Sequence, residues 1–212
     1  HEPHDENREY SRKDSIHAGD DPTIRQIRWE WAGNLVLLPA CHLRSTLKAI
    51  MRIHLATDHA GLELLRDLAE HLTDAGHDVV DHGPTRFDPL DDYPGFCIRA
   101  AQAVVADQAS GVEALGIVLG GSGNGEQIAA NKVAGVRAAL VWNRDTAVLA
   151  REHNDANVCA IGARQHGFDE AVMLIEAFIA TGFSGDERHV RRIGQIGHFE
   201  NTGAVLESGQ TY

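Results

Sequence analysis

The chain has 212 residues, which suits one domain of ordinary size with a full hydrophobic core and flanking extensions. Its 31 acidic and 19 basic residues give a formal net charge of −12 at pH 7, without any long basic run. Because nucleic-acid phosphates are repelled by an acidic protein, this composition argues against a nucleic-acid partner.

The three cysteines, Cys41, Cys97 and Cys159, are odd in number and widely spaced, and none forms a C-x-x-C pair. Neither a disulfide framework nor a zinc site is predicted, and we expect a reducing, cytoplasmic location. The apolar stretch 35–41 (LVLLPAC) is far shorter than the roughly 18 apolar residues that a membrane span requires, so no membrane association is expected. A lipobox-like interpretation of this stretch is the weaker alternative.

Residues 1–50 differ from the rest of the chain. The segment 1–21 is crowded with charge and poor in apolar residues, which is typical of disorder. The segment 24–50 contains Trp29 and Trp31 and predicts only a short helix at 43–50. We interpret residues 1–50 as an N-terminal extension, either disordered or a non-native leader; a partner-binding arm is the alternative.

From Met51 onward, strand and helix patterns alternate regularly. Strands are predicted at 52–57, 78–81, 115–119, 138–142 and 158–161. Helices are predicted at 61–75, 94–107, 126–133, 145–152 and 168–181, with a last helical region at 185–199 and a C-terminal tail, 201–212, that frays. A loop rich in proline, glycine and aspartate occupies 82–92. Strands that alternate with helices predict an α/β fold in which helices cover both faces of a parallel sheet.

The stretch 116–132 (GIVLGGSGNGEQIAANK) runs from an apolar strand through a glycine-rich turn into a helix. Such a turn gathers backbone N–H groups at the positive end of a helix dipole, which favours a phosphate, a carboxylate or a developing oxyanion. Glu126 stands where a dinucleotide fingerprint needs its third glycine, and no Gly-Lys-Ser/Thr ends the turn as in a P-loop. Both nucleotide motifs are therefore disfavoured, and a tight turn without a ligand is the remaining alternative.

Residues able to transfer protons or bind anions flank several predicted strands. They are Asp58 and His59 after the first strand, Ser122 to Glu126 after the third, His153 and Asn154 before the fifth, and Arg164 after it. We expect the topology to direct all of them to one edge of the sheet, where ligands bind in such folds. Taken singly, Asp58 could only cap a helix, and any one of thirteen histidines is more often a surface residue. Their convergence predicts proton transfer.

Six motifs follow one another between residues 51 and 199. They are Asp58-His59-Ala60-Gly61, Asp92-Tyr93-Pro94, 120–126 (GGSGNGE), 129–132 (AANK), Glu152-His153-Asn154, and Arg188-His189 with Arg191-Arg192. Together they resemble the ribose-5-phosphate isomerase B family, which also includes the galactose-6-phosphate and allose-6-phosphate isomerases. The resemblance implies a Rossmann-like, three-layer αβα sandwich with a five-stranded parallel sheet. It also implies a homodimer with shared active sites, and an aldose–ketose isomerase that works through an enediolate without metal or other cofactor.

Positions carried over from the family give a catalytic set. Glu126 resembles the base that moves a proton between C1 and C2 in the actinobacterial-type branch, whereas the cysteine base of another branch matches Gly120. His153 matches the residue that opens the sugar ring. The hydroxyl of Ser122 and the turn amides are expected to stabilise the oxyanion.

The expected substrate-binding set is larger. The matched residues are Asp58, Tyr93 and Asn154 beside the sugar, and His59, Arg164, Arg188 and Arg192 at the phosphate; the turn adds Gly121, Gly123, Asn124 and Gly125. Arg188 and Arg192 lie four residues apart, on one helical face, and the resemblance implies that they reach in from the partner subunit.

We therefore interpret residues 51–200 as a sugar-phosphate isomerase domain of the pentose phosphate pathway, acting on D-ribose 5-phosphate and D-ribulose 5-phosphate. One alternative is a family member acting on a six-carbon sugar phosphate. The other is a non-catalytic nucleotide-binding module, which would be indifferent to the loss of Glu126.

Overall fold

The computed structural model describes residues 50–207 and residue 210. The predictions for residues 1–49 therefore lie outside the described residues. Within the described part, no helix is both long and apolar enough to cross a membrane.

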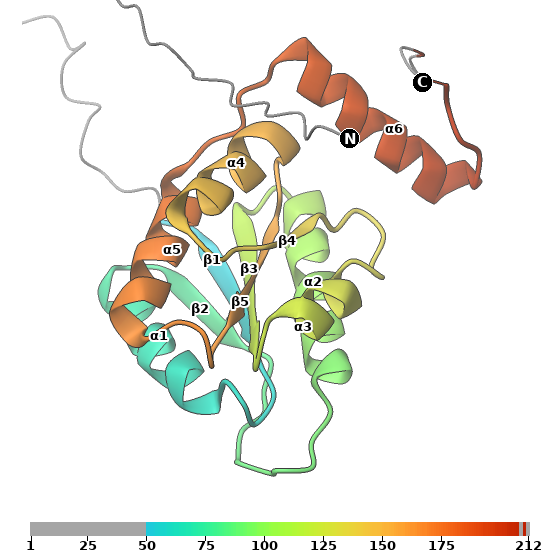
Figure 1. Cartoon of the computed structure of the whole chain (residues 1–212). Coiled ribbons are helices and arrows are strands. Elements are labelled where there is room, and N and C mark those ends of the chain that lie inside the picture. The colour runs from blue at the N-terminus through green and yellow to red at the C-terminus, as the bar shows by residue number, and fades with distance from the viewer. Residues whose placement is uncertain (1–49, 208–209, 211–212) are drawn as a thin grey trace, which may run out of the picture. The chain divides into compact units, whose positions relative to one another are not determined.

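Five parallel strands form one sheet in the order β2-β1-β3-β5-β4 (Figure 1). They are β1 (Arg52–Ala56), β2 (Asp78–Asp81), β3 (Ala114–Gly120), β4 (Ala138–Leu140) and β5 (Val158–Gly162). Every residue of the central strand β3 is buried, as expected for an apolar strand covered on both faces. The predicted α/β fold with a five-stranded parallel sheet is confirmed.

Helices form a layer on each face of the sheet. One face is covered by α1 (Leu62–Asp74), α4 (Arg144–Asn154) and α5 (Phe168–Ala180). The other is covered by α2 (Tyr93–Ala109) and α3 (Asn124–Ala130). The first layer packs large side chains such as Phe178 and Leu65, whereas the second packs mainly alanine and valine against the sheet. The last helix, α6 (Glu187–Thr202), contacts α4.

Because all strands run in one direction, the sheet has an amino edge, where strands begin, and a carboxyl edge, where they end. The register is consistent across the sheet: Gly116 pairs with Val158 near the start of β5, and Gly120 pairs with Gly162 at its end. A segment that follows a strand therefore lies at the carboxyl edge, and a segment that precedes a strand lies at the amino edge.

The helices differ from their predicted bounds by a few residues, and for two of them the local sequence explains where the helix begins. Helix α3 begins at Asn124, two residues earlier than predicted, because Gly123 takes a φ of +79° that lets the turn enter the helix at once. Helix α4 begins at Arg144, because Asn143 accepts a hydrogen bond from the Thr146 backbone N–H in a reciprocal capping box. The strand before it, β4, correspondingly ends at Leu140 instead of residue 142.

Candidate active site

The glycine-rich turn after β3 is packed tightly against the end of β5. A Cβ on Gly123 would lie 2.8 Å from a Leu140 methyl group and 3.0 Å from the Ile161 carbonyl carbon. A Cβ on Gly162 would lie 3.0 Å from the Ser122 backbone. Close backbone approach of this kind requires glycine, and it fixes the turn at the carboxyl edge.

Glu126 lies in the first turn of α3, directly behind this turn, with only 4% of its surface exposed. Its carboxylate lies so close to Gly120 that a Cβ there would overlap it. Burial raises the pKa of Glu126; its own backbone N–H opposes that rise, and the negative charge of Asp58 adds to it. A buried carboxyl group with a raised pKa is suited to take up and return a proton near neutral pH.

Asp58 and Cys97 lie close to Glu126. Asp58, 8% exposed at the end of β1, accepts a hydrogen bond of 2.9 Å from the Ala60 backbone N–H. Burial, followed by the negative charges of Glu126 and Asp58, raises the pKa of the Cys97 thiol to about 12. The thiol therefore stays protonated at neutral pH and is a poor base, which leaves the carboxylates as the proton acceptors of this group.

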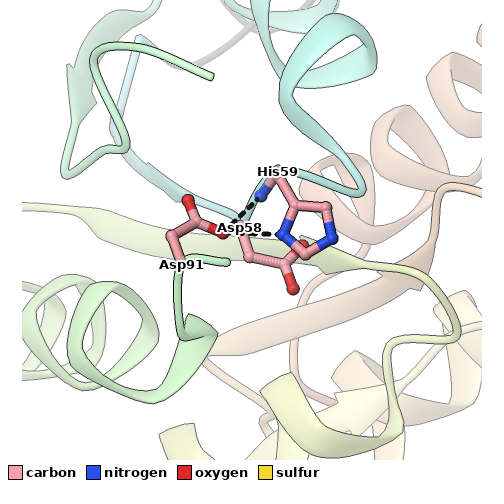
Figure 2. A group of neighbouring side chains, drawn as sticks. All are labelled: Asp58, His59 and Asp91. Atoms are coloured by element: carbon pink, nitrogen blue, oxygen red, sulfur yellow. Dashed lines mark hydrogen bonds and ion pairs between the residues drawn. The ribbon is translucent and has the colours of Figure 1, made fainter. Parts of the chain in front are cut away.

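His59 is held by Asp91, a residue that sequence reasoning did not select (Figure 2). One oxygen, Asp91 Oδ1, lies 2.7 Å from His59 Nδ1 and accepts a 3.0 Å hydrogen bond from the His59 backbone N–H. The only sequence signal for Asp91 was its place in the acidic loop 82–92, directly before the Asp92-Tyr93-Pro94 motif.

Asp58, His59 and Asp91 each place one metal-ligating atom within 4.8 Å of the others. Their hydrogen bonds already account for this cluster, because Asp58 Oδ1 and Asp91 Oδ1 accept backbone N–H groups and Asp91 also holds the imidazole. The arrangement is that of a histidine oriented by a carboxylate.

Tyr93 and Arg164 also flank the glycine turn. The Tyr93 ring packs on Gly125, where a Cβ would lie 2.6 Å from the phenolic oxygen. The Arg164 guanidinium lies beside Gly121, 3.4 Å from the place of a Cβ there. An aromatic hydroxyl and a cation therefore border the same turn as Glu126.

The turn also holds Ser122 and Asn124, which were both predicted as site residues. The Asn124 side-chain amide donates a 3.2 Å hydrogen bond to the hydroxyl oxygen of Ser122. Asn124 is exposed and Ser122 is half-buried, so both can meet a ligand that enters from solvent.

The prediction that His153 and Asn154 converge on this edge was wrong for a single chain. Both residues end α4 and precede β5, which places them at the amino edge. Arg137, which precedes β4, donates a 2.8 Å hydrogen bond to the Asn154 carbonyl there. The error arose because residues before a parallel strand were grouped with residues after one.

Helix α6 lies next to His153. The His153 and His189 rings are 4.3 Å apart between centroids, and the Ser184 hydroxyl lies 3.2 Å from His189 Nδ1. Arg188 and Arg192 are both exposed on the same helix. The ring-opening candidate and the two arginines thus form an amino-edge group, separate from the carboxyl-edge group of Glu126.

Comparisons with known proteins show the family of the chain. The family model described as Ribose/Galactose Isomerase matches residues 53–196, more than half of the chain. A ribose-5-phosphate isomerase B from Mycobacterium tuberculosis is 53% identical over 152 residues, which cover 72% of this chain and 91% of that protein.

Two solved structures are also similar. Ribose-5-phosphate isomerase B from Clostridium thermocellum has a TM-score of 0.67 and 39% identity, with 73% of this chain and all of that chain covered. The Mycoplasma genitalium enzyme, solved with bound ribulose-5-phosphate, has a TM-score of 0.67 and 40% identity, with 72% and 97% covered.

Proposed function

The chain belongs to the ribose/galactose isomerase family, and on that basis we propose that it interconverts D-ribose 5-phosphate and D-ribulose 5-phosphate through an enediolate. Support comes from the relatives that carry this activity in their names and from the Mycoplasma genitalium structure with its bound ribulose-5-phosphate. We place the activity in residues 51–200 and in the cytoplasm.

The observation that carries the proposal is the buried carboxylate of Glu126 behind the glycine turn. In the forward reaction it removes the C2 proton of the open-chain aldose, which leaves an enediolate with negative charge on O1. The same carboxylic acid then returns the proton to C1, while the O2 hydroxyl loses its proton to become the carbonyl oxygen and that proton passes to O1. The turn amides and the Ser122 hydroxyl are suited to stabilise the oxyanion.

A glutamate base, as in the actinobacterial-type branch, is favoured by the packing around Gly120. A side chain at position 120, where the other branch has its cysteine, would overlap the Glu126 carboxylate. The glutamate therefore fills the space that the thiol of the other branch would need. The two cysteines among the described residues are poor substitutes, because burial raises the pKa of both Cys97 and Cys159.

Substrate binding divides between the two edges of the sheet. At the carboxyl edge, Asp58 and Tyr93 would contact the sugar, and His59 and Arg164 would bind the phosphate. Arginine suits that role because its planar guanidinium makes paired, charged hydrogen bonds.

The amino-edge group of one chain would act in the active site of a second copy of the chain. His153 would open the furanose ring there, with Asn154 holding a sugar hydroxyl and with Arg188 and Arg192 reaching the phosphate. Since these residues lie away from Glu126 in one chain, a homodimer with shared sites is the arrangement that lets all of them act on one substrate.

The test is formation of ribulose 5-phosphate from ribose 5-phosphate by the full chain, with a metal chelator present. We expect turnover that the chelator does not change. Allose 6-phosphate and galactose 6-phosphate serve as comparison substrates. A higher kcat/KM on either would mean that the preferred substrate is a hexose phosphate and not a pentose phosphate. A chain that turns over none of the three would contradict the proposed function.

A further inference from the structure

One carboxylate oxygen of Asp91 contacts two nitrogens of His59. Asp91 Oδ1 accepts the hydrogen bond of the His59 backbone N–H at 3.0 Å and lies 2.7 Å from ring Nδ1. The Asp91 side chain is only 11% exposed, whereas the His59 side chain is 26% exposed. The carboxylate is thus largely removed from water, while part of the imidazole stays open to a ligand.

The loop that carries Asp91 is itself fixed to the end of β1. Thr57 N–H donates to the Gly83 carbonyl at 3.1 Å, and Asp91 N–H donates to the Asp88 carbonyl at 3.1 Å. The Phe87 ring meets the edge of the His59 ring, with centroids 6.1 Å apart and planes at 90°. Loop 82–92 therefore holds the imidazole by a hydrogen bond and by an aromatic contact.

This hydrogen bond determines which ring nitrogen is available. Since a carboxylate only accepts hydrogen bonds, Nδ1 must carry a proton toward Asp91. Figure 2 shows the second ring nitrogen, Nε2, pointing away from Asp91. When Nε2 also carries a proton it can donate to an anion, and the Asp91 charge compensates the imidazolium that results.

We propose that Asp91 is a positioning residue for phosphate binding, because it fixes the orientation of the His59 ring and compensates its charge when both ring nitrogens carry a proton, so that the Nε2–H group donates to the substrate phosphate. This inference rests on the proposed function, in which His59 binds the phosphate of the sugar. Asp91 acts through His59 and makes no contact with the reacting carbon atoms.

The test compares Asp91→Asn with Asp88→Asn in the full chain. Asp88 lies on the same loop and is exposed, and its side chain accepts a local hydrogen bond from the Leu90 N–H, which an asparagine side chain can also accept. Both variants remove one negative charge. We expect Asp91→Asn to raise the KM for ribose 5-phosphate and the inhibition constant of inorganic phosphate about three- to tenfold, with kcat within twofold of wild type, because the neutral amide can still accept the hydrogen bond but no longer compensates the imidazolium charge. Asp88→Asn should change neither constant.

Two further measurements separate positioning from a general structural role. Asp91→Glu keeps a carboxylate and should recover part of the phosphate affinity. In a His59→Gln background, Asp91→Asn should have almost no further effect on KM, because the residue through which it acts is already gone.

The outcomes also separate this inference from the proposed function. Equal behaviour of Asp91→Asn and Asp88→Asn in an active enzyme, or additive effects of Asp91→Asn and His59→Gln, would overturn the role of Asp91 alone. If the wild-type chain isomerises no sugar phosphate, the proposed function fails. In that case, titration of ¹⁵N-histidine-labelled protein with inorganic phosphate still tests the role of Asp91. It shows whether phosphate shifts the His59 nitrogen signals in the wild-type chain but not in Asp91→Asn.

Discussion

At the carboxyl edge of the sheet Glu126 and Asp58 are packed against backbone, whereas at the amino edge His153 is half-buried and two arginines of α6 are exposed. Glu126 and Asp58 are more than nine-tenths buried, and a Cβ at Gly120 or Gly125 would collide with a site residue. Arg188 and Arg192 are exposed on α6. One chain thus fixes the proposed base by itself, whereas the proposed ring-opening and arginine groups lie at the opposite edge.

The largest effect is expected from Glu126→Gln, which tests whether the carboxyl edge alone carries the proton transfer. Glutamine keeps the shape and polarity of the side chain, so the fold and the KM should change little. The loss of the base should lower kcat about a hundredfold or more, the usual scale of general acid–base catalysis. Steady-state kinetics and exchange of the substrate C2 proton with deuterated solvent measure this loss.

Ser122→Ala is the matched control within the same turn. It should cost less than Glu126→Gln, because the backbone amides that stabilise the oxyanion remain. If Glu126→Gln exchanges the C2 proton at the wild-type rate while Cys97→Ala does not, the base is a thiol and the glutamate assignment is wrong.

The second prediction tests whether the carboxyl edge of one chain and the amino edge of another form one active site, by mixing two inactive variants. Glu126→Gln and Arg188→Ala change opposite edges, so a heterodimer with shared sites has one site with both changes and one with neither. Random exchange of equal amounts makes half of the dimers mixed, and about a quarter of all sites should then be intact. We expect activity to rise toward that fraction of the wild-type value.

Repeating the experiment with His153→Ala in place of Arg188→Ala sharpens the comparison, because His153 lies beside α6 at the same edge. Recovery with both partners would assign the whole amino-edge group to the second copy. Demonstrated chain exchange without recovery would place these residues and Glu126 in one chain's site.

The differences between the edges also explain what the sequence could predict. The apolar run of β3 and the glycines behind it predicted a buried strand and a tight turn, because both depend on local pattern. The place of His153 was predicted wrongly, because motifs were grouped without asking whether each precedes or follows its strand. Asp91 was missed because its pairing with His59, 32 residues away, depends on the course of loop 82–92.

The third prediction concerns stability and involves neither edge group. His54 Nδ1 lies 2.9 Å from His82 Nε2, and His54 Nε2 lies 3.0 Å from Asp107 Oδ2. Burial lowers the pKa of both histidines. The unfolded chain therefore binds protons at a higher pH than the folded chain does, and the free energy of unfolding should fall as pH falls below about 6.5.

Over the pH range between its unfolded and folded pKa values, each of these histidines lowers the free energy of unfolding by up to about 1.4 kcal/mol for every unit that the pH falls. Urea denaturation between pH 7.5 and 5 should show a shallower pH dependence for His82→Gln, which keeps a donor near His54 but cannot titrate. His198→Gln on α6, outside this pair, is the control and should keep the wild-type slope. An unchanged slope in His82→Gln would assign the acid sensitivity to other groups.

The smallest effect is expected from removing residues 1–50. All strands and helices that form the two edges lie between Arg52 and Thr202, and the family match covers 53–196. A chain that starts at Met51 should fold and keep its kcat/KM within tenfold of the full chain, which corresponds to less than about 1.4 kcal/mol. A chain that starts at Thr57 and lacks β1 is the contrasting control, because it loses the strand between β2 and β3 and should not fold. A larger loss in the Met51 chain would mean that residues 1–50 contribute to one of the two edges, and mixing that chain with Glu126→Gln would then identify which edge they serve.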